Sequence, residues 1–274
     1  MITSRNKVIQ SNHIFGQLVL GPPGSGKSTY CFEMSKYLRE IGREVSIINL
    51  DPGNENMKYT PDIDIMNLIK VEDVMEFHKL GPNGSLMYCM EYLEKNVKWL
   101  ISELKKLKPS YLIFDCPGQI EIFTHSRCLS NIFNKLEIMG YHLCSVNLIE
   151  SHYCSEPTKF ISTLLLSLNI MLNISLPHVN VLSKAELFKR FESKLIFNLE
   201  FYTEVLDLKF LLEAIDFDFP KYAKLNAAIV SMVEDYSLVT FELLDYYNKT
   251  TVAKVKHAID KANGYINASE ESND

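Results

Sequence analysis

Gly21-Pro22-Pro23-Gly24-Ser25-Gly26-Lys27-Ser28-Thr29 is the stretch of this sequence that decides the fold. It matches the pattern G-x-x-x-x-G-K-[ST], follows a short apolar run from Phe15 to Leu20, and opens a segment with helical apolar spacing. A strand, a glycine-rich loop and a helix in that order predict a phosphate-binding loop, whose N–H groups converge on phosphate oxygens at the helix N-terminus. An ordinary glycine turn is the alternative, and the strand-loop-helix setting argues against it. The residues expected to bind nucleotide are Pro23, Gly24, Ser25, Gly26, Lys27, Ser28 and Thr29, with Lys27 on the β- and γ-phosphates and Ser28 on Mg²⁺.

Further apolar runs follow this loop, separated by helical stretches. They lie at 45–50, 111–114, 142–148, 179–182 and 238–243. Because strands that are apolar throughout are buried on both sides, this alternation predicts an α/β fold with three layers. A mostly parallel sheet would carry helices on both faces, and ligands would bind at the carboxyl ends of its strands.

The chain is expected to form one domain. Its 274 residues, 47% of them hydrophobic, suffice for one sizeable core. Residues 1–266 are assigned to that domain, and the segment 188–221, rich in acidic and aromatic residues, reads as a helical insertion into it. Residues 267–274 are polar and acidic, a composition that predicts a disordered tail.

Composition also excludes several classes of function. The formal net charge of −6 gives no general attraction to nucleic acid, so direct nucleic-acid binding is not expected. No apolar run approaches the ~20 residues of a membrane span, and residues 1–12 lack the apolar core of a signal peptide, so we expect a cytoplasmic or nuclear protein without a membrane partner. The six cysteines contain no C-x-x-C pair, which predicts packed, reduced thiols and argues against a metal-cysteine site.

Two aspartates end neighbouring strands and are candidates for the magnesium site. Asp51 lies in Asn49-Leu50-Asp51-Pro52-Gly53-Asn54-Glu55, and Asp115 lies in Phe114-Asp115-Cys116-Pro117-Gly118-Gln119-Ile120-Glu121. With Ser28 they supply the oxygen ligands that Mg²⁺ prefers. Taken singly, each aspartate is more often a turn or helix cap. Gln119 can orient the attacking water, and Glu121 can accept a proton, with a helix-start acid as its equally weighted alternative.

A base-recognition element follows the fifth strand, at Ser183-Lys184-Ala185-Glu186. The carboxylate of Glu186 would accept hydrogen bonds from the N1–H and 2-amino groups of guanine, which adenine lacks, so guanine is favoured. A solvated acid at a helix start is the alternative. Lys184 is expected to lay its alkyl stem along the base plane. Gly81-Pro82-Asn83-Gly84, taken on its residues alone, predicts a plain turn before a helix from Leu86 to Leu107.

The segments GPPGSGKST, NLDPGNE, GPNG, DCPGQIE and SKAE, in that order and spacing, resemble the GPN-loop GTPases. The segments SHYCSEPTKFIS, FNLEFYTEVLDLKFLLEAI, MVEDYSLVTF and DKANGY extend the resemblance, to one eukaryotic type of that family, over almost the whole chain. The resemblance implies GTP or GDP with Mg²⁺ as ligands and a dimer in which Asn83 acts in trans, near the partner's γ-phosphate. It further implies that Asp115, Gln119 and Glu121 position magnesium and water, and that Tyr236 and Ser237 lie near the base.

The same resemblance implies a biological setting. It suggests a homodimer or a heterodimer with another GPN-loop GTPase, RNA polymerase II subunits or assembly factors as partners, and a role in polymerase assembly and nuclear import. Glu186 replaces the family's Asp, and Gly53 stands where the family often has Ala. The alternatives are a nucleotide-gated assembly scaffold with little turnover and an ATPase or small-molecule kinase on the same fold.

Overall fold

A single parallel sheet organises the part of the chain that a computed structural model describes, residues 14–55, 57–190, 195–205, 207–218, 220–236 and 239–266. Its seven strands run in the order β3-β2-β4-β1-β5-β6-β7, and every neighbouring pair is parallel. The strands are β1 Ile14–Leu20, β2 Val45–Asn49, β3 Ile63–Asp64, β4 Tyr111–Asp115, β5 Tyr141–Glu150, β6 His178–Ser183 and β7 Phe241–Leu243. The predicted α/β architecture with a parallel sheet is confirmed.

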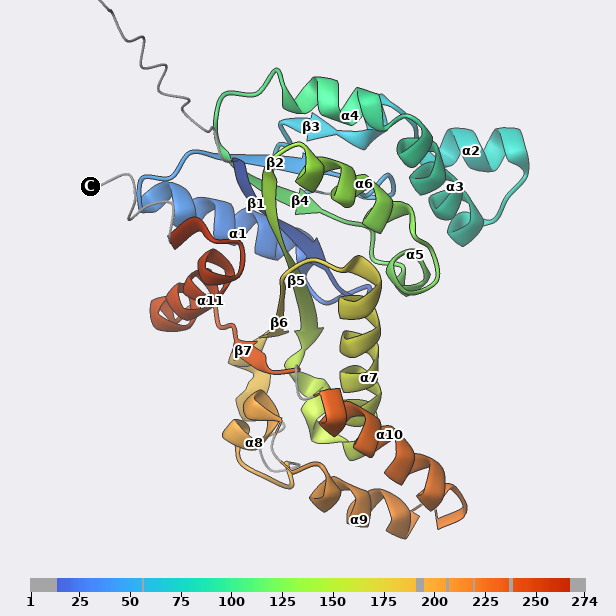
Figure 1. Cartoon of the computed structure of the whole chain (residues 1–274), viewed down its shortest axis with the longest axis vertical. Coiled ribbons are helices and arrows are strands. Elements are labelled where there is room, and N and C mark those ends of the chain that lie inside the picture. Colours follow the sequence, from blue (N-terminus) through green and yellow to red (C-terminus); the bar gives the residue numbers. More distant parts are fainter. Residues whose placement is uncertain are drawn as a thin grey trace, which may run out of the picture.

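Helices cover both faces of the sheet (Figure 1). On β1, Leu18 and Leu20 face one apolar cluster and Val19 faces another, as the two-residue period of a strand requires. One side carries α1 Lys27–Glu40 and α11 Lys249–Ala262. The other carries α2 Val71–His78, α3 Pro82–Lys95, α4 Val97–Leu104, α5 Ile120–Thr124 and α6 Cys128–Ile138, with the 3₁₀ turn η1 Ile65–Asn67 beside them.

A third apolar cluster joins the helices beyond β5 and β6, and these helices gather at one end of the molecule in Figure 1. They are α7 Pro157–Ile174, α8 Leu199–Glu204, α9 Lys209–Asp218 and α10 Ala223–Tyr236, with the 3₁₀ turns η2 Ser151–Ser155, η3 Ala185–Arg190 and η5 Pro220–Tyr222. The segment read as an insertion, 188–221, supplies α8 and α9. Helix α9 packs against α7 and α10 with Leu211 buried between them, and Tyr202 of α8 contacts the ring of Phe160 on α7.

Helix α7 is long and apolar enough to cross a membrane by length and composition alone, although no apolar run of that length was expected from the sequence. Such helices also occur in protein cores, and here Phe160, Leu164 and Leu168 of α7 are buried in the third cluster. The packing of these side chains therefore accounts for its apolar composition.

The region around Asn83 differs from the sequence-based expectation. Pro82 is the first residue of α3 and Gly81 is its extended N-cap, so Asn83 and Gly84 lie in the first helical turn rather than in a separate turn. Proline is well suited to that position because its fixed φ matches the helix and its missing N–H would have no partner there. The single helix predicted from Leu86 to Leu107 is also wrong, since it divides at Asn96 into α3 and α4.

All six cysteines are free and buried, as predicted. Strand β3 has two residues and was missed, because so short a run carries no readable period. The tail 267–274, the lead-in 1–12 and Leu238 lie outside the described residues.

Candidate functional site

The glycine-rich loop between β1 and α1 lies at the carboxyl edge of the sheet. Gly24 and Gly26 have φ of 83° and 92°, and Gly26 is the left-handed N-cap of α1. Gly21 also has positive φ, and a Cβ there would come within 2.4 Å of the carbonyl oxygen of Leu148. The path of the loop therefore requires glycine at Gly21, as the sequence pattern indicated.

Lys27 is folded back onto its own loop. Its ammonium group donates hydrogen bonds to the carbonyl oxygens of Gly21, at 3.1 Å, and Pro22, at 3.4 Å. Burial lowers the pKa of Lys27, while the carboxylates of Asp115 and Asp51 oppose that shift. Gly118 lies against the same group, since a Cβ there would be 2.8 Å from Lys27 Nζ. The loop after β4 thus packs directly on Lys27, the residue expected to bind the phosphates.

Register places the two candidate carboxylates beside this loop. Asp115, the last residue of β4, is aligned with Val19 of β1 and with Asn49 of β2, so Asp51 lies just beyond the aligned strand ends. Burial raises the pKa of Asp115 against the opposing effects of hydrogen bonds from Tyr59 and Ser28. Burial also raises the pKa of Asp51, opposed by the N–H of Gly53 and the charge of Lys27. Both groups would be stabilised in their charged form by a nearby cation.

Two residues that sequence reasoning did not single out hold Asp115. The hydroxyl of Tyr59 donates a 2.5 Å hydrogen bond to Asp115 Oδ2, and the side-chain amide of Asn54 lies 3.4 Å from the same oxygen. The Asn54 amide also donates to Ser28 Oγ at 2.9 Å. Asn54 stood within the NLDPGNE motif and could have been found there, whereas nothing in the pattern marked Tyr59.

The oxygen atoms around Ser28 fit a magnesium ion. Asp115 Oδ1 is buried and has no hydrogen-bond partner among the described residues. A buried carboxylate oxygen without a partner is costly, and a hard cation is the group that would satisfy it. Ser28, Asp51 and Asp115 are the residues that would hold the ion and its water shell.

The residues expected to handle the attacking water line one small cavity of about 240 Å³. Gln119 is the N-cap of α5, Glu121 is exposed in its first turn, and Asn83 and Met87 face them from α3. The structure therefore brings Asn83 close to Gln119 and Glu121 within one chain. The resemblance had implied that Asn83 reaches the site of a partner.

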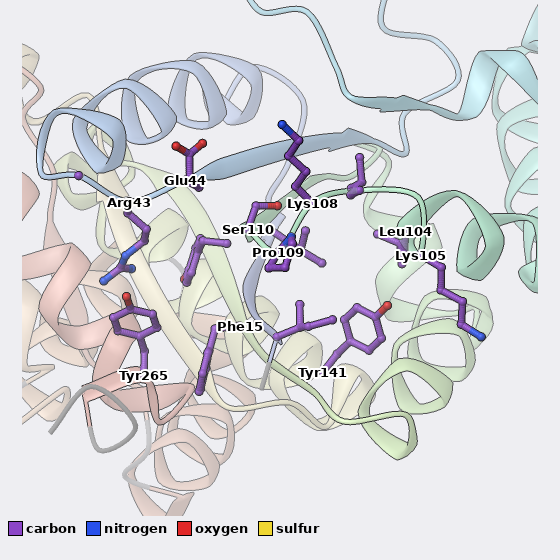
Figure 2. Close-up of a pocket in the computed structure, with 15 residues that line it drawn as sticks. Phe15, Arg43, Glu44, Leu104, Lys105, Lys108, Pro109, Ser110, Tyr141 and Tyr265 are labelled. Carbon is purple, nitrogen blue, oxygen red and sulfur yellow. The ribbon is translucent and has the colours of Figure 1, made fainter. Parts of the chain in front are cut away.

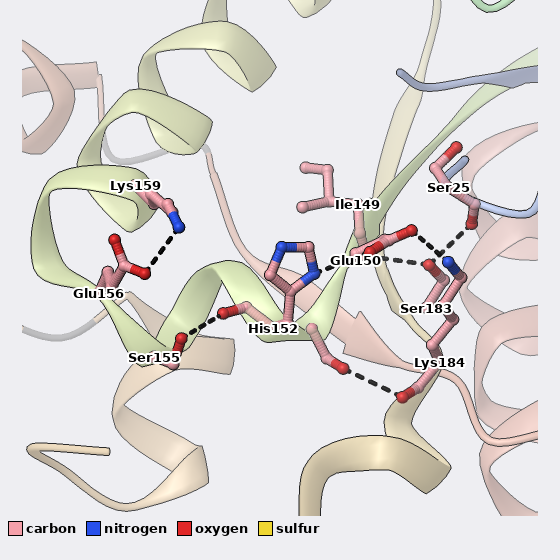
Figure 3. A network of polar contacts seen from close by, with 10 residues as sticks. Ser25, Ile149, Glu150, His152, Ser155, Glu156, Lys159, Ser183 and Lys184 are labelled. Carbon is pink, nitrogen blue, oxygen red and sulfur yellow. Dashed lines mark hydrogen bonds and ion pairs between the residues drawn. The ribbon is translucent and has the colours of Figure 1, made fainter. Parts of the chain in front are cut away.

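The base-recognition loop is tied to the phosphate loop through the end of β5 (Figure 3). Ser183 donates hydrogen bonds to the carbonyl oxygens of Ser25, at 2.9 Å, and Ile149, at 3.1 Å. Lys184, in the left-handed region with φ of 58°, pairs with one carboxylate oxygen of Glu150. His152 Nδ1 lies 2.7 Å from the other carboxylate oxygen of Glu150, Oε2. The lysine head group is thus held at the end of β5 by a carboxylate that the sequence reading missed.

Two polar atoms at the nucleotide side of these loops have no partner among the described residues. Glu186 Oε2, at the start of η3, and Ser25 Oγ are both buried and unpaired. Ala185 donates its N–H to the carbonyl of Leu244 at 3.1 Å, which fixes the start of η3 next to β7. The Glu186 carboxylate therefore presents a free acceptor in a partly buried position.

Tyr236, expected near the base, is the last residue of α10 and is 46% exposed. No described contact joins it to the phosphate loop or to Ser183–Glu186. Ser237 lies outside the described residues.

A larger cavity, of about 460 Å³, opens at the opposite, amino-terminal edge of the sheet (Figure 2). Phe15, Tyr141 and Tyr265 line it, and the Arg43 guanidinium stacks 3.7 Å above the Tyr265 ring while pairing with Asp260. No residue of the predicted nucleotide-binding motifs lines this cavity, so we do not assign the nucleotide site to it although it is the larger of the two.

Comparison with known proteins identifies relatives over almost the full length. A family model described as "Conserved hypothetical ATP binding protein" matches residues 19–265. The chain is 51% identical to the "GPN-loop GTPase 2 homolog" of Dictyostelium discoideum, over 94% of this chain and 82% of that protein. It is also 51% identical to "GPN-loop GTPase QQT1" of Arabidopsis thaliana, over 92% and 86%. The crystal structure of a GTPase from Pyrococcus abyssi in its apo form has the same fold, with a TM-score of 0.75 at 20% identity over 92% of this chain and 98% of that one.

Proposed function

Since the chain belongs to the GPN-loop GTPases and is a GTP hydrolase, we propose that it works as a dimeric, magnesium-dependent nucleotide switch. The family description names ATP, whereas the relatives are named GTPases. The carboxylate of Glu186 favours guanine, because adenine presents an unprotonated N1 that would repel it.

One observation carries this proposal. Among the described residues, three of the six buried polar side-chain atoms without a partner are Ser25 Oγ, Asp115 Oδ1 and Glu186 Oε2. They belong to the phosphate loop, the magnesium site and the base-recognition loop. Since buried polar atoms in folded proteins are almost always paired, their coincidence with the three ligand-binding motifs supports a bound magnesium-nucleotide as the missing partner.

The proposed hydrolysis uses groups at the carboxyl edge of the sheet. Lys27 would exchange its two loop carbonyls for the β- and γ-phosphate oxygens, and the loop N–H groups would bind the same phosphates. When bound, magnesium would neutralise charge on the phosphoryl oxygens. Gln119 would orient a water for in-line attack on the γ-phosphorus, and Glu121 would accept the proton of that water. The bond between the γ-phosphorus and the β–γ bridging oxygen breaks, and GDP leaves with that oxygen. Glu121 is exposed, so this step requires exclusion of solvent by a closed site.

A second subunit would close the site. The face around Asn83 is exposed and carries Phe77, which is 83% exposed, and Leu80, which is 38% exposed. Exposed apolar side chains beside an incomplete site favour a protein partner there. We propose a homodimer, or a heterodimer with another GPN-loop GTPase, in which Asn83 supports phosphoryl transfer in the partner's site.

Mixing two inactive variants tests this arrangement. In a heterodimer of Asn83→Ala and Gln119→Ala, a site that uses its own Gln119 and the partner's Asn83 would be intact. Random mixing should then restore about a quarter of the wild-type activity, because half of the dimers would contain one intact site of two. Failure to restore activity would assign Asn83 to its own chain, where it already shares a cavity with Gln119. A solution mass that stays monomeric with a GTP analogue and Mg²⁺ would refute the dimer.

The cellular role proposed is assembly and nuclear import of RNA polymerase II, with polymerase subunits or assembly factors as clients and shuttling between cytoplasm and nucleus. It rests on the family resemblance. The variant Gln119→Ala distinguishes a nucleotide switch, which requires turnover, from an assembly scaffold, which requires only bound nucleotide. The variant should lose hydrolysis by about 100-fold, because no side chain then orients the water. If turnover drives assembly, client assembly should be lost as well. If the variant keeps client assembly, the bound state alone suffices and the scaffold reading replaces the switch.

Calorimetric titration with GDP and with ADP in Mg²⁺ tests the nucleotide. We expect tight GDP binding and no measurable ADP binding, and Glu186→Gln should weaken GDP binding about 10-fold or more because a charge-assisted pair of hydrogen bonds is lost. Glu186→Asp should keep guanine selectivity. Equal binding of GDP and ADP by the wild type would instead support the ATPase alternative.

A further inference from the structure

The side chain of Asn54 stands between two oxygen ligands proposed for magnesium. Its amide nitrogen lies 2.9 Å from Ser28 Oγ and 3.4 Å from Asp115 Oδ2. Asn54 comes from the segment after β2, whereas Ser28 opens α1 and Asp115 ends β4. Three separate chain segments therefore meet at this amide.

An amide NH₂ group imitates a cation in this position. Its hydrogens carry partial positive charge, and its nitrogen donates to a hydroxyl oxygen and to a carboxylate oxygen. A magnesium ion lies about 2.0–2.1 Å from each oxygen that it binds directly. A cation on the Ser28 hydroxyl would use the oxygen that now accepts a hydrogen bond from Asn54, and its charge would repel the partly positive amide group 2.9 Å from that oxygen.

The surroundings hold Asn54 close to this place. Asp51 Oδ1 accepts the N–H of Gly53 at 3.0 Å, and Asn54 donates its own N–H to the carbonyl of Asp51 at 3.3 Å. The turn that carries Asn54 is therefore built on Asp51, itself a proposed magnesium ligand. Asn54 is half-buried, so its side chain has room to leave towards solvent.

We infer that Asn54 is a competitor of magnesium: its amide bonds Ser28 Oγ and Asp115 Oδ2 and must be displaced from them when magnesium-nucleotide binds. The inference rests on the proposed magnesium site. Asn54 bonds both Ser28 and Asp115, and breaking these two hydrogen bonds sets part of the cost of loading the ion. Asn54 thereby lowers magnesium affinity without ligating the ion.

Equilibrium titration of Mn²⁺, as a paramagnetic substitute for Mg²⁺, into the GDP-loaded protein measures this directly. The variants are Asn54→Ala, which removes the amide, and Asn54→Ser, which keeps a polar group too short to bridge the two oxygens. Both should tighten Mn²⁺ binding about three- to 10-fold, the range that corresponds to one net hydrogen bond. Asn131→Ala is the matched control, because Asn131 is an exposed asparagine on α6 that bonds Glu94.

Each outcome is decisive. Tighter metal binding in both Asn54 variants with no change in the control supports the competition. Weaker binding would overturn it and make Asn54 a residue that orients the ligands, and unchanged binding would overturn it as well. Absence of GDP binding by the wild type would refute the nucleotide site and this inference together, whereas normal GDP binding with unaltered Mn²⁺ affinity refutes the inference alone.

Discussion

The hydroxyl of Ser183, the last residue of β6, donates a 2.9 Å hydrogen bond to the carbonyl oxygen of Ser25 in the phosphate loop. These residues are 158 positions apart in the chain, and the bond joins the loop proposed to read the base to the loop proposed to bind the phosphates. Ser183 also reaches the carbonyl of Ile149 on β5. These hydrogen bonds hold the two loops in a fixed relation to one another.

Ser183→Ala should lower GDP affinity about 10-fold and destabilise the fold by about 1–2 kcal/mol, because two buried carbonyl oxygens lose a donor. Titration calorimetry and urea unfolding measure the two effects. Ser155→Ala, which removes a similar hydroxyl-to-carbonyl bond in η2, should leave GDP binding unaltered. Equal affinity of Ser183→Ala and wild type would show that the two loops are positioned independently.

Glu150→Gln should weaken GDP binding about three- to 10-fold. The pair with Glu150 holds the Lys184 head group beside the phosphate loop, and a partly buried ion pair of this kind contributes about 1 kcal/mol. Fluorescent GDP displacement gives the affinity, and Mn²⁺ affinity should not alter. The control is Glu156→Gln, whose exposed pair with Lys159 lies on the first turn of α7. A Glu150→Gln protein that binds GDP like the wild type would remove Glu150 from the site.

Gly118→Ala should reduce hydrolysis about 10- to 100-fold with little loss of stability. The added Cβ would lie 2.8 Å from Lys27 Nζ, so the flexible end of the lysine must move, while the backbone of Pro23 is farther away, at 3.4 Å. Misplacing a group that contacts the transferring phosphoryl is costly for the rate. Steady-state kinetics measures the loss of hydrolysis, and the melting temperature measures the change in stability. Strong destabilisation would show that the close contact is with the backbone instead.

His178 should make stability fall in mild acid. Burial lowers the pKa of His178 to about 4, against a hydrogen bond with Asn180 that raises it. The unfolded chain takes up this proton near pH 6.5 and the folded chain only near pH 4, so the unfolded state binds more protons between these values. Stability is therefore lost as the pH falls from about 6.5 to about 4, by roughly 3 kcal/mol for this group.

Urea unfolding at pH 7.5 and pH 5 checks this prediction. His178→Gln should show a smaller difference between the two pH values than the wild type does. His257→Gln, at an exposed position on α11, should retain the full difference. An unchanged pH dependence in His178→Gln would assign the acid sensitivity to other groups.

The sequence by itself determined the parallel α/β class, the phosphate loop and the two strand-end aspartates. These are local signals. The adjacent residues from Gly21 to Thr29 suffice to predict the phosphate loop, and an apolar run such as Val45–Asn49 suffices to predict a buried strand. Strand ends align in a parallel sheet, so the positions of Asp51 and Asp115 followed from the strands alone.

Only the tertiary structure decided how these pieces meet. Asn54, Tyr59 and Glu150 hold Asp115, Ser28 and Lys184 through contacts between segments far apart in sequence, which no local pattern encodes. The start of α3 at Pro82 likewise depends on packing, because residues such as Leu86 and Met90 are buried against the sheet, whereas glycine and asparagine in isolation favour a turn. Local chemistry thus specified which residues could form the site, and long-range packing specified which of them hold the others in place.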